Sequence, residues 1–145
     1  MRLIPKLFRL SRKGRWLLLQ SAWLLISIRV ALAVVPFKWL LDRISLDRHS
    51  DVTLALSDVE RIVWSIEAVS RRLPFGRTCL TKALTAKFLL DRRGYCADLR
   101  IGVARGAAGQ LEAHAWIERG SAIVIGGPRC AVDRYQPLLH TATTQ

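Results

Sequence analysis

The sequence predicts an α+β domain, in which helices come first and a further helix packs on a small antiparallel sheet. Two patterns support this prediction: apolar residues recur at helical spacing up to residue 93, and they alternate with more polar residues from residue 95 onward. Helices followed by strands are typical of the α+β class. Because 51% of the 145 residues are hydrophobic, the chain can bury a core, and an intrinsically disordered chain is excluded.

The first predicted helix lies in a nearly unbroken apolar run over residues 16–35. This run is about as long as a membrane span. Four polar residues interrupt it, however, and one of them is Arg29, which a helix surrounded by lipid would tolerate poorly. We therefore expect a helix that is buried in the core or packed on a partner, with a helix at a membrane surface and a spanning helix as alternatives.

A second helix is predicted over residues 58–72, after a polar connection. Ser57 and Glu60 have the spacing of a capping box, and apolar residues then follow at helical intervals until Pro74. These signals predict an amphipathic helix with one buried face.

A third helix is predicted over residues 79–93, because Gly94 is the residue type that commonly follows a helix C-terminus. Residues then alternate between apolar and polar, which predicts three strands, over residues 95–104, 111–118 and 122–125. We expect the three strands to form an antiparallel meander and the remaining C-terminal segment to be irregular.

Positive charge is concentrated at the N-terminus of a chain whose net charge is +12. Residues 1–15 contain six Lys or Arg residues and no acid. Such an end attracts phosphates, although a solvated basic face is the plainer interpretation. No basic–aromatic strand pattern and no zinc-finger spacing accompany it, so we expect no nucleic-acid partner.

The distribution of charge and apolar residues divides the chain into a basic, apolar helical segment over residues 1–50 and a core domain over residues 51–145.

The three cysteines are too few and odd in number for a disulfide-stapled secreted scaffold. We therefore expect a cytoplasmic protein with reduced thiols. Whether the basic N-terminus also contacts a membrane surface is left open by the sequence.

A candidate for chemistry is Cys79, at the start of the third predicted helix. Unpaired N–H groups and the helix dipole favour a thiolate there, and Lys82 adds positive charge. His114 lies in the middle of a predicted strand, from which it could reach the sulfur as a general base. A structural Cys and a structural His are the plainer alternative. The other cysteines, Cys96 and Cys130, do not begin a helix. The cysteine spacing fits no common zinc site, so we expect no metal and no cofactor.

Two runs in the chain carry a resemblance to a known family: LPFGRTCLTKALTAKFLLDRRGYCADLRIGVARG and EAHAWIERGSAIVIGGP. In the first run a Cys-Leu pair opens a helix, Arg-Arg-Gly closes it, and a strand ends in Ile-Gly-Val. The second run contains Ala-His-Ala-Trp. Together they resemble the leader-peptide-cleaving protease of lasso-peptide biosynthesis, a transglutaminase-like branch of the papain-like cysteine proteases. The resemblance implies a transglutaminase-like fold with a papain-like core.

The resemblance also implies that Cys79 is the nucleophile and His114 the general base of a cysteine endopeptidase. Its substrate would be a ribosomally made lasso-peptide precursor, from which it removes the leader. A separate asparagine-synthetase-like cyclase would then close the ring. Fused members of the family carry a winged-helix leader-binding module, and residues 1–50 show no strand pattern for one. We therefore expect the stand-alone form, with a separate leader-recognition protein docked on the apolar N-terminal helices.

The third catalytic group departs from the family pattern, which usually has an acidic residue on the strand after the His. A short hairpin places residues 125–127 opposite His114, and they are Ile-Gly-Gly. Four options remain for the group that holds the imidazole: a backbone carbonyl, Asp98, Asp133 or no group at all. Asp133 is favoured because its segment returns past the sheet. The missing acid also keeps an alternative function open: a non-catalytic module that binds a peptide or a membrane on the same fold.

Overall fold

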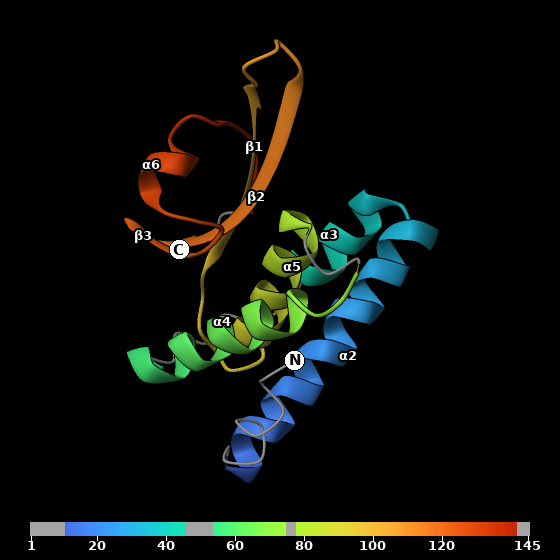
Figure 1. Cartoon of the computed structure of the whole chain (residues 1–145), viewed down its shortest axis with the longest axis vertical. Coiled ribbons are helices and arrows are strands. Elements are labelled where there is room, and N and C mark those ends of the chain that lie inside the picture. The colour runs from blue at the N-terminus through green and yellow to red at the C-terminus, as the bar shows by residue number, and fades with distance from the viewer. Residues whose placement is uncertain (1–10, 46–53, 75–77, 142–145) are drawn as a thin grey trace.

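The structure is a computed structural model that describes residues 11–45, 54–74 and 78–141. Its helices are α2 (Arg12–Val34), α3 (Phe37–Ser45), α4 (Leu56–Ser70), α5 (Cys79–Asp91) and the short α6 (Arg129–Val132), and its strands are β1 (Asp98–Arg105), β2 (Leu111–Arg119), β3 (Ala122–Ile125) and β4 (Gln136–Thr141). The strands form one antiparallel sheet in the order β3-β2-β1-β4. Figure 1 labels β1, β2 and β3. The α+β prediction is confirmed.

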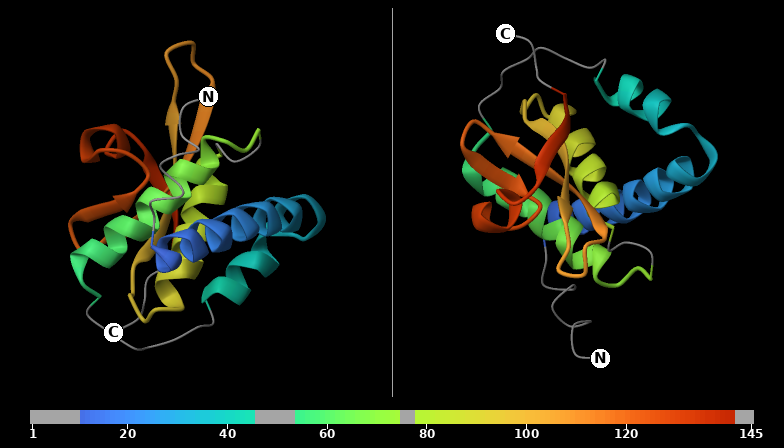
Figure 2. Two further views of the ribbon diagram at one scale, coloured as in Figure 1. Left: turned by 60° about the horizontal axis from the view of Figure 1, so that its bottom comes forward. Right: turned by 90° about the horizontal axis from the view of Figure 1, so that it is seen from above.

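The elements are arranged in layers, with α4 and α5 between α2 and the sheet (Figures 1 and 2). One hydrophobic core joins these layers, and it includes Leu25 of α2, Ile66 of α4, Leu84 of α5 and Ile117 of β2. Because α2 contributes to the same core as the sheet, it is a structural part of the domain. The boundary that the sequence predicted at residue 50 lies outside the described residues.

The contact between α2 and α4 includes a buried polar pair. Ser21 and Ser65 are both fully buried, and their hydroxyl oxygens are 2.8 Å apart. The Ser65 hydroxyl also donates to the carbonyl of Ile62, 2.7 Å away. The Ser21 hydroxyl is therefore left to donate to Ser65, which fixes α2 against α4 at this point.

The helix predicted over residues 58–72 is confirmed, but its start differs from the prediction. The N–H groups of Asp58 and Val59 both donate to the carbonyl of Ala55, so the helix begins with Ala55 as its N-cap. Ser57 then lies inside the first turn, and no side chain caps this N-terminus. The predicted capping box is therefore wrong, because the chain was already helical two residues earlier.

Helix α5 begins at Cys79 as predicted and is buried on most of its surface, because α2, α4 and the sheet surround it. Its one buried cation, Lys87, lies 2.8 Å from Asp91 one turn further on. Beyond its end Gly94 has a φ of 75°, a conformation that glycine adopts without strain. The N–H of Tyr95 then donates to the carbonyl of Leu90 and closes the turn before the sheet begins.

Three of the four strands were predicted, and β4 was missed. The sequence assigned its segment to irregular structure, but residues 136–141 pair with β1 at the edge of the sheet. Gln136, Pro137 and Leu138 are exposed, so no alternation of apolar and polar residues marks this strand. Its register shifts between Ile101 and Gly102, which further weakens any regular pattern.

Candidate active site

A cleft of about 250 Å³ lies where α4 and α5 meet the β2–β3 side of the sheet. It brings together Cys79 and His114, which are far apart in the sequence. The lining residues are Glu67, Cys79, Lys82, Ala83, His114, Ala115, Ile125, Gly126 and Gly127.

Cys79 is the first residue of α5 and is partly exposed. Its N-cap, Thr78, makes no capping hydrogen bond through its side chain. The N–H groups of the first turn have no acceptor within the helix, so they can stabilise negative charge near the sulfur. The sulfur itself lies 4.0 Å from the carbonyl oxygen of Ala113, the residue before His114 in β2.

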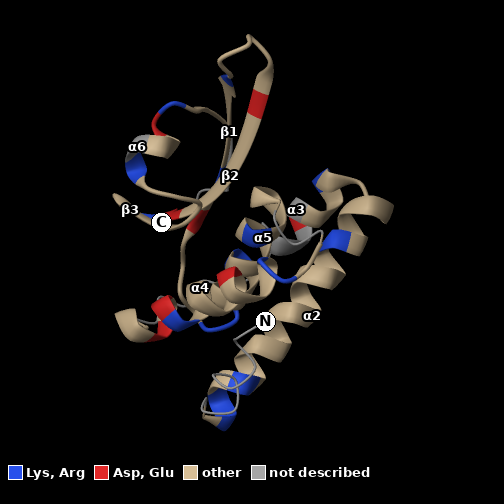
Figure 3. Cartoon of the chain, in the orientation of Figure 1, with Lys and Arg blue, Asp and Glu red and all other residues tan. Residues whose placement is uncertain are grey.

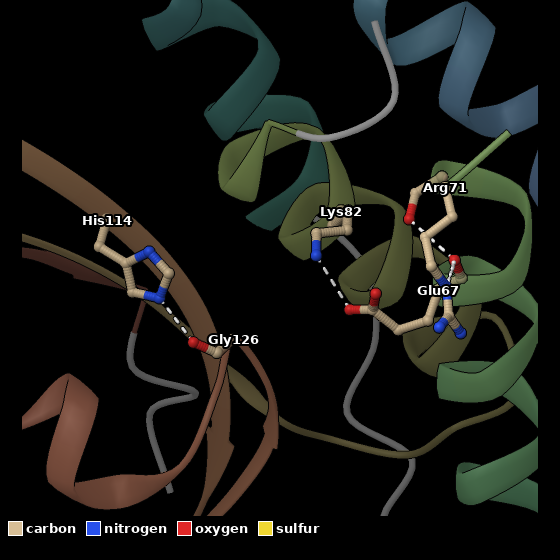
Figure 4. Close-up of polar contacts among 6 residues, drawn as sticks. Glu67, Arg71, Lys82, His114 and Gly126 are labelled. Carbon is tan, nitrogen blue, oxygen red and sulfur yellow. Dashed lines mark hydrogen bonds and ion pairs between the residues drawn. The ribbon is translucent and has the colours of Figure 1, made fainter. Parts of the chain in front are cut away.

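His114 is held by a backbone carbonyl. Its Nε2 atom lies 2.6 Å from the carbonyl oxygen of Gly126, just beyond the end of β3 (Figure 4). A carbonyl oxygen can only accept a hydrogen bond, so Nε2 carries the proton. In the neutral ring the unprotonated nitrogen is then Nδ1, which is free to act as a base.

Two aromatic rings stack beside the imidazole. The ring centroid of Tyr135 lies 5.1 Å from that of His114, and the centroid of Trp116 lies 6.0 Å away. Gly102 is the register partner of His114, and a Cβ atom there would come within about 3 Å of both Tyr135 and Trp116. A residue without a side chain at this position therefore lets the aromatic rings close around the imidazole.

Gly126 is a position that only glycine can occupy. Its φ is 126°, and an added Cβ would overlap the Cβ of Trp116. The backbone therefore passes close to β2 and presents its carbonyl to His114. This is one of the four options that the sequence left open for the third group.

The structure does not bring the two candidate aspartates to the imidazole. Asp133 is the C-cap residue after the short α6, is exposed, and lies 3.5 Å from Arg129. Asp98 is the first residue of β1 and is the register partner of Glu118, four residue pairs from His114. Neither aspartate lines the cleft. The choice of Asp133 from sequence therefore has no support in the geometry, because its carboxylate faces Arg129.

The sequence does not predict an ion pair that lies on the helical side of the cleft. The ammonium of Lys82 lies 2.9 Å from the carboxylate of Glu67 (Figure 4). Lys82 is one turn after Cys79 on α5, whereas Glu67 comes from α4. The Arg71 side chain donates to the backbone carbonyl of Glu67 at 3.1 Å and so leaves its carboxylate to Lys82. The sequence spacing showed Lys82 near the nucleophile, but gave no signal for a partner on another helix.

A larger cleft of about 610 Å³ lies between the first turns of α2 and α4. Its lining includes Lys13, Arg61 and Arg93 together with two tryptophans, but no Cys or His. Burial lowers the pKa of Arg93, and the neighbouring charge of Arg92 lowers it further. This cleft combines cations, the carboxylate of Asp58 and apolar surface, and neither Cys79 nor His114 lines it. Among the described residues, no group of three or more metal-binding side chains gathers.

A family model described as the Transglutaminase-like superfamily matches residues 22–140. The match runs from α2 to β4 and therefore includes the cleft and the aromatic rings beside it. No curated protein and no solved structure matches the chain.

Proposed function

Because the chain belongs to the transglutaminase-like superfamily, we propose that it is a cysteine peptidase. The observation that carries the proposal is the shared cleft of Cys79 and His114, with His114 Nε2 on the Gly126 carbonyl. A cysteine at a helix N-terminus and a histidine whose other nitrogen is already occupied are the two groups that nucleophilic acyl transfer needs. Superfamily membership is compatible with this chemistry.

The first half of the reaction forms an acyl-enzyme. Nδ1 of His114 takes the thiol proton of Cys79, and the sulfur attacks the scissile carbonyl carbon. The negative charge that develops on the carbonyl oxygen is stabilised by the N–H of Cys79 at the start of α5. The imidazolium then gives its proton to the leaving amine, the C–N bond breaks, and the acyl group stays on sulfur as a thioester.

The second half hydrolyses the thioester. His114 takes a proton from water, the resulting hydroxide attacks the thioester carbonyl, and the C–S bond breaks. The proton returns to the sulfur from the imidazolium. The Gly126 carbonyl accepts from Nε2 throughout, so it keeps the ring in one orientation and stabilises its positive charge.

Lys82 and Glu67 have a positioning role in this scheme. The ammonium of Lys82 lies one turn from Cys79 and favours negative charge in the cleft. Glu67 holds that ammonium at 2.9 Å, and both side chains line the cleft.

We infer the substrate from the sequence motifs around Cys79 and His114, which resemble those of lasso-peptide leader peptidases. The substrate is then a ribosomally made precursor peptide, and the bond cleaved joins its leader to its core. A separate leader-recognition protein presents the precursor, and an asparagine-synthetase-like cyclase uses the freed core.

The test is a cleavage assay with a lasso precursor peptide and its leader-recognition protein, followed by mass spectrometry. Cys79→Ala and His114→Ala should each lose cleavage, because one removes the nucleophile and the other removes the base. Cys96→Ala is the matched control, since Cys96 is also partly exposed but lies outside the cleft. Wild-type cleavage by either of the first two variants would refute the assignment.

The alternative function is a non-catalytic peptide-binding module, and the lack of a carboxylate on His114 favours it. Iodoacetamide distinguishes the two functions. An active nucleophile is alkylated at Cys79 faster than at Cys96, and His114→Ala slows the reaction at Cys79. A binding module would retain the precursor without cutting it, and His114→Ala would leave the alkylation rate unchanged.

A further inference from the structure

One face of α2 is buried and the opposite face is apolar and exposed. Leu18, Ser21, Leu25 and Ile28 are buried against the other helices. Large apolar side chains recur on the exposed side at helical spacing, and we call them the outer face of α2: Trp16, Leu19, Trp23, Ile26, Val30 and Val34. Trp16, at the edge of this face, also lines the cleft between α2 and α4. Trp23 is 72% exposed and Val34 is 77% exposed. An apolar stripe of this length, flanked by the exposed Arg29, marks an interaction surface rather than scattered surface residues.

The packing of α2 on α4 and α5 limits the ways in which this helix can bind a membrane. By length and composition α2 could span a bilayer. A spanning position, however, would pull Leu25 out of the core and break the buried hydrogen bond between Ser21 and Ser65. A helix that stays packed on α4 and α5 can offer lipid only its outer face, which is the geometry of a helix lying in the interface plane.

The charges beside the outer face indicate an anionic surface. Arg12, Lys13 and Arg15 are exposed in the first turn of α2, and Lys38 and Trp39 are exposed on α3. Figure 3 shows that Lys and Arg residues gather at the start of α2. Residues 1–41 contain eight Lys or Arg residues, and the first acid in the chain is Asp42. A second copy of the chain would bring two such cationic segments together, which like-charge repulsion disfavours. Anionic lipid headgroups complement these charges, and Trp side chains favour the headgroup level.

We propose that the outer face of α2 binds the surface of an anionic lipid bilayer, with the helix lying in the plane of the interface. Trp16 and Trp23 enter the headgroup region, and Arg12, Lys13 and Arg15 pair with lipid phosphates. Because α4 and α5 separate α2 from the sheet, the cleft with Cys79 and His114 faces the aqueous side when the protein is bound. This inference does not depend on the proposed peptidase activity.

The experiment measures sedimentation of the full chain with phosphatidylcholine vesicles, with and without about one quarter of phosphatidylglycerol. The wild type should bind the anionic vesicles, bind the neutral ones weakly, and dissociate in high salt. Trp16→Ser with Trp23→Ser should lose binding. Arg12→Gln, Lys13→Gln and Arg15→Gln together should weaken binding about a hundredfold, at about fivefold per cation. Brominated lipid should quench the tryptophan fluorescence of the wild type but not of the double Trp variant.

The matched control is Leu111→Ser. Leu111 is 73% exposed on β2, so it is as apolar and as accessible as the outer face but lies on another layer. It should bind vesicles as the wild type does, and circular dichroism should show that all variants are folded. A loss of binding in Leu111→Ser equal to that of the double Trp variant would overturn the assignment to α2.

Four further outcomes would overturn the proposal. The first is no binding to anionic vesicles. The second is self-association that depends on Trp16 and Trp23, which would make a second copy the occupant. The third is capture of the leader-recognition protein by the outer face without lipid binding, the docking expected from the sequence. The fourth is resistance of the bound protein to alkaline extraction, which would indicate a spanning helix.

Discussion

The cleft and the outer face of α2 lie on opposite sides of the α4–α5 layer, and they are built in contrasting ways. The cleft depends on a few polar atoms at fixed distances, such as Nε2 of His114 at 2.6 Å from the Gly126 carbonyl. The outer face depends on the summed area of six exposed apolar side chains. A site of the first kind should fail when one atom moves, whereas a surface of the second kind should weaken by degrees. The predictions below test this contrast, from the largest effect to the smallest.

The largest effect is expected from Gly126→Ala. The added Cβ would overlap Trp116, and the φ of 126° is strained for alanine, so unfolding should require about 3 kcal/mol less free energy. The carbonyl should also shift away from His114, and kcat for leader cleavage should fall by about a hundredfold or more. Urea unfolding and the cleavage assay measure the two effects.

Gly127→Ala is the matched variant for this prediction. Gly127 also has a positive φ, 107°, but a Cβ there would meet nothing within 4 Å. It should cost only the backbone strain, about 1 kcal/mol, and should reduce cleavage much less. Equal losses in both glycine variants would show that strain alone, and not the position of the carbonyl, explains Gly126→Ala.

A smaller effect, about tenfold in kcat, is expected from Lys82→Met. The variant removes the cation one turn from Cys79 while keeping most of the side-chain volume. Stability should change little, because both members of the ion pair are partly exposed. Lys82→Arg should restore most of the rate. A fall in stability without a fall in kcat would place Lys82 outside the chemistry and leave it as a structural residue.

A smaller effect on stability is expected from breaking the Ser21–Ser65 hydrogen bond, which joins α2 to the α4–α5 layer. Ser21→Ala removes a buried partner of the Ser65 hydroxyl and should cost about 1–2 kcal/mol of unfolding free energy. Ser21→Ala with Ser65→Ala should cost less than the sum of the two single changes, because no hydroxyl of the pair is then left behind. Urea unfolding of all four proteins measures the coupling. Strictly additive costs would mean that this hydrogen bond does not hold α2 to α4, and would remove an argument against a spanning helix.

The sequence predicted those parts of the fold in which burial follows a regular period. Helix α5 begins at Cys79, and β3 spans residues 122–125, as expected from their patterns. The β4 strand is not predicted because its first residues are exposed at a sheet edge. The start of α4 is predicted two residues too late, because the capping motif at Ser57 is a local signal and the helix begins at Leu56. Periodicity reports which side of an element is buried, and it says little about an exposed edge.

Prediction of the candidate site from the sequence is limited in a similar way, because only side chains on regular elements have a predictable direction. Cys79 and His114 can be predicted because a helix start and an alternating strand give side chains a direction that can be inferred. A backbone carbonyl is only one of the options that the sequence leaves open, and Gly126 is not singled out, since every residue has a carbonyl and the sequence does not show where it points. Tyr135 was missed together with β4, because its ring reaches His114 only once that segment returns to the sheet.

The smallest effect is expected from Asp133→Asn, and it tests the third group directly. Asp133 is exposed and pairs with the equally accessible Arg129 at 3.5 Å, an interaction that contributes little to stability. If the Gly126 carbonyl holds His114, the variant should keep cleavage within about twofold of the wild type and unfold at an unchanged urea concentration. A hundredfold loss of kcat with an unchanged fold would mean that the carboxylate reaches the imidazole during the reaction. The cleft would then depend on a side chain brought in by α6, and the Gly126 carbonyl would hold the ring only between turnovers.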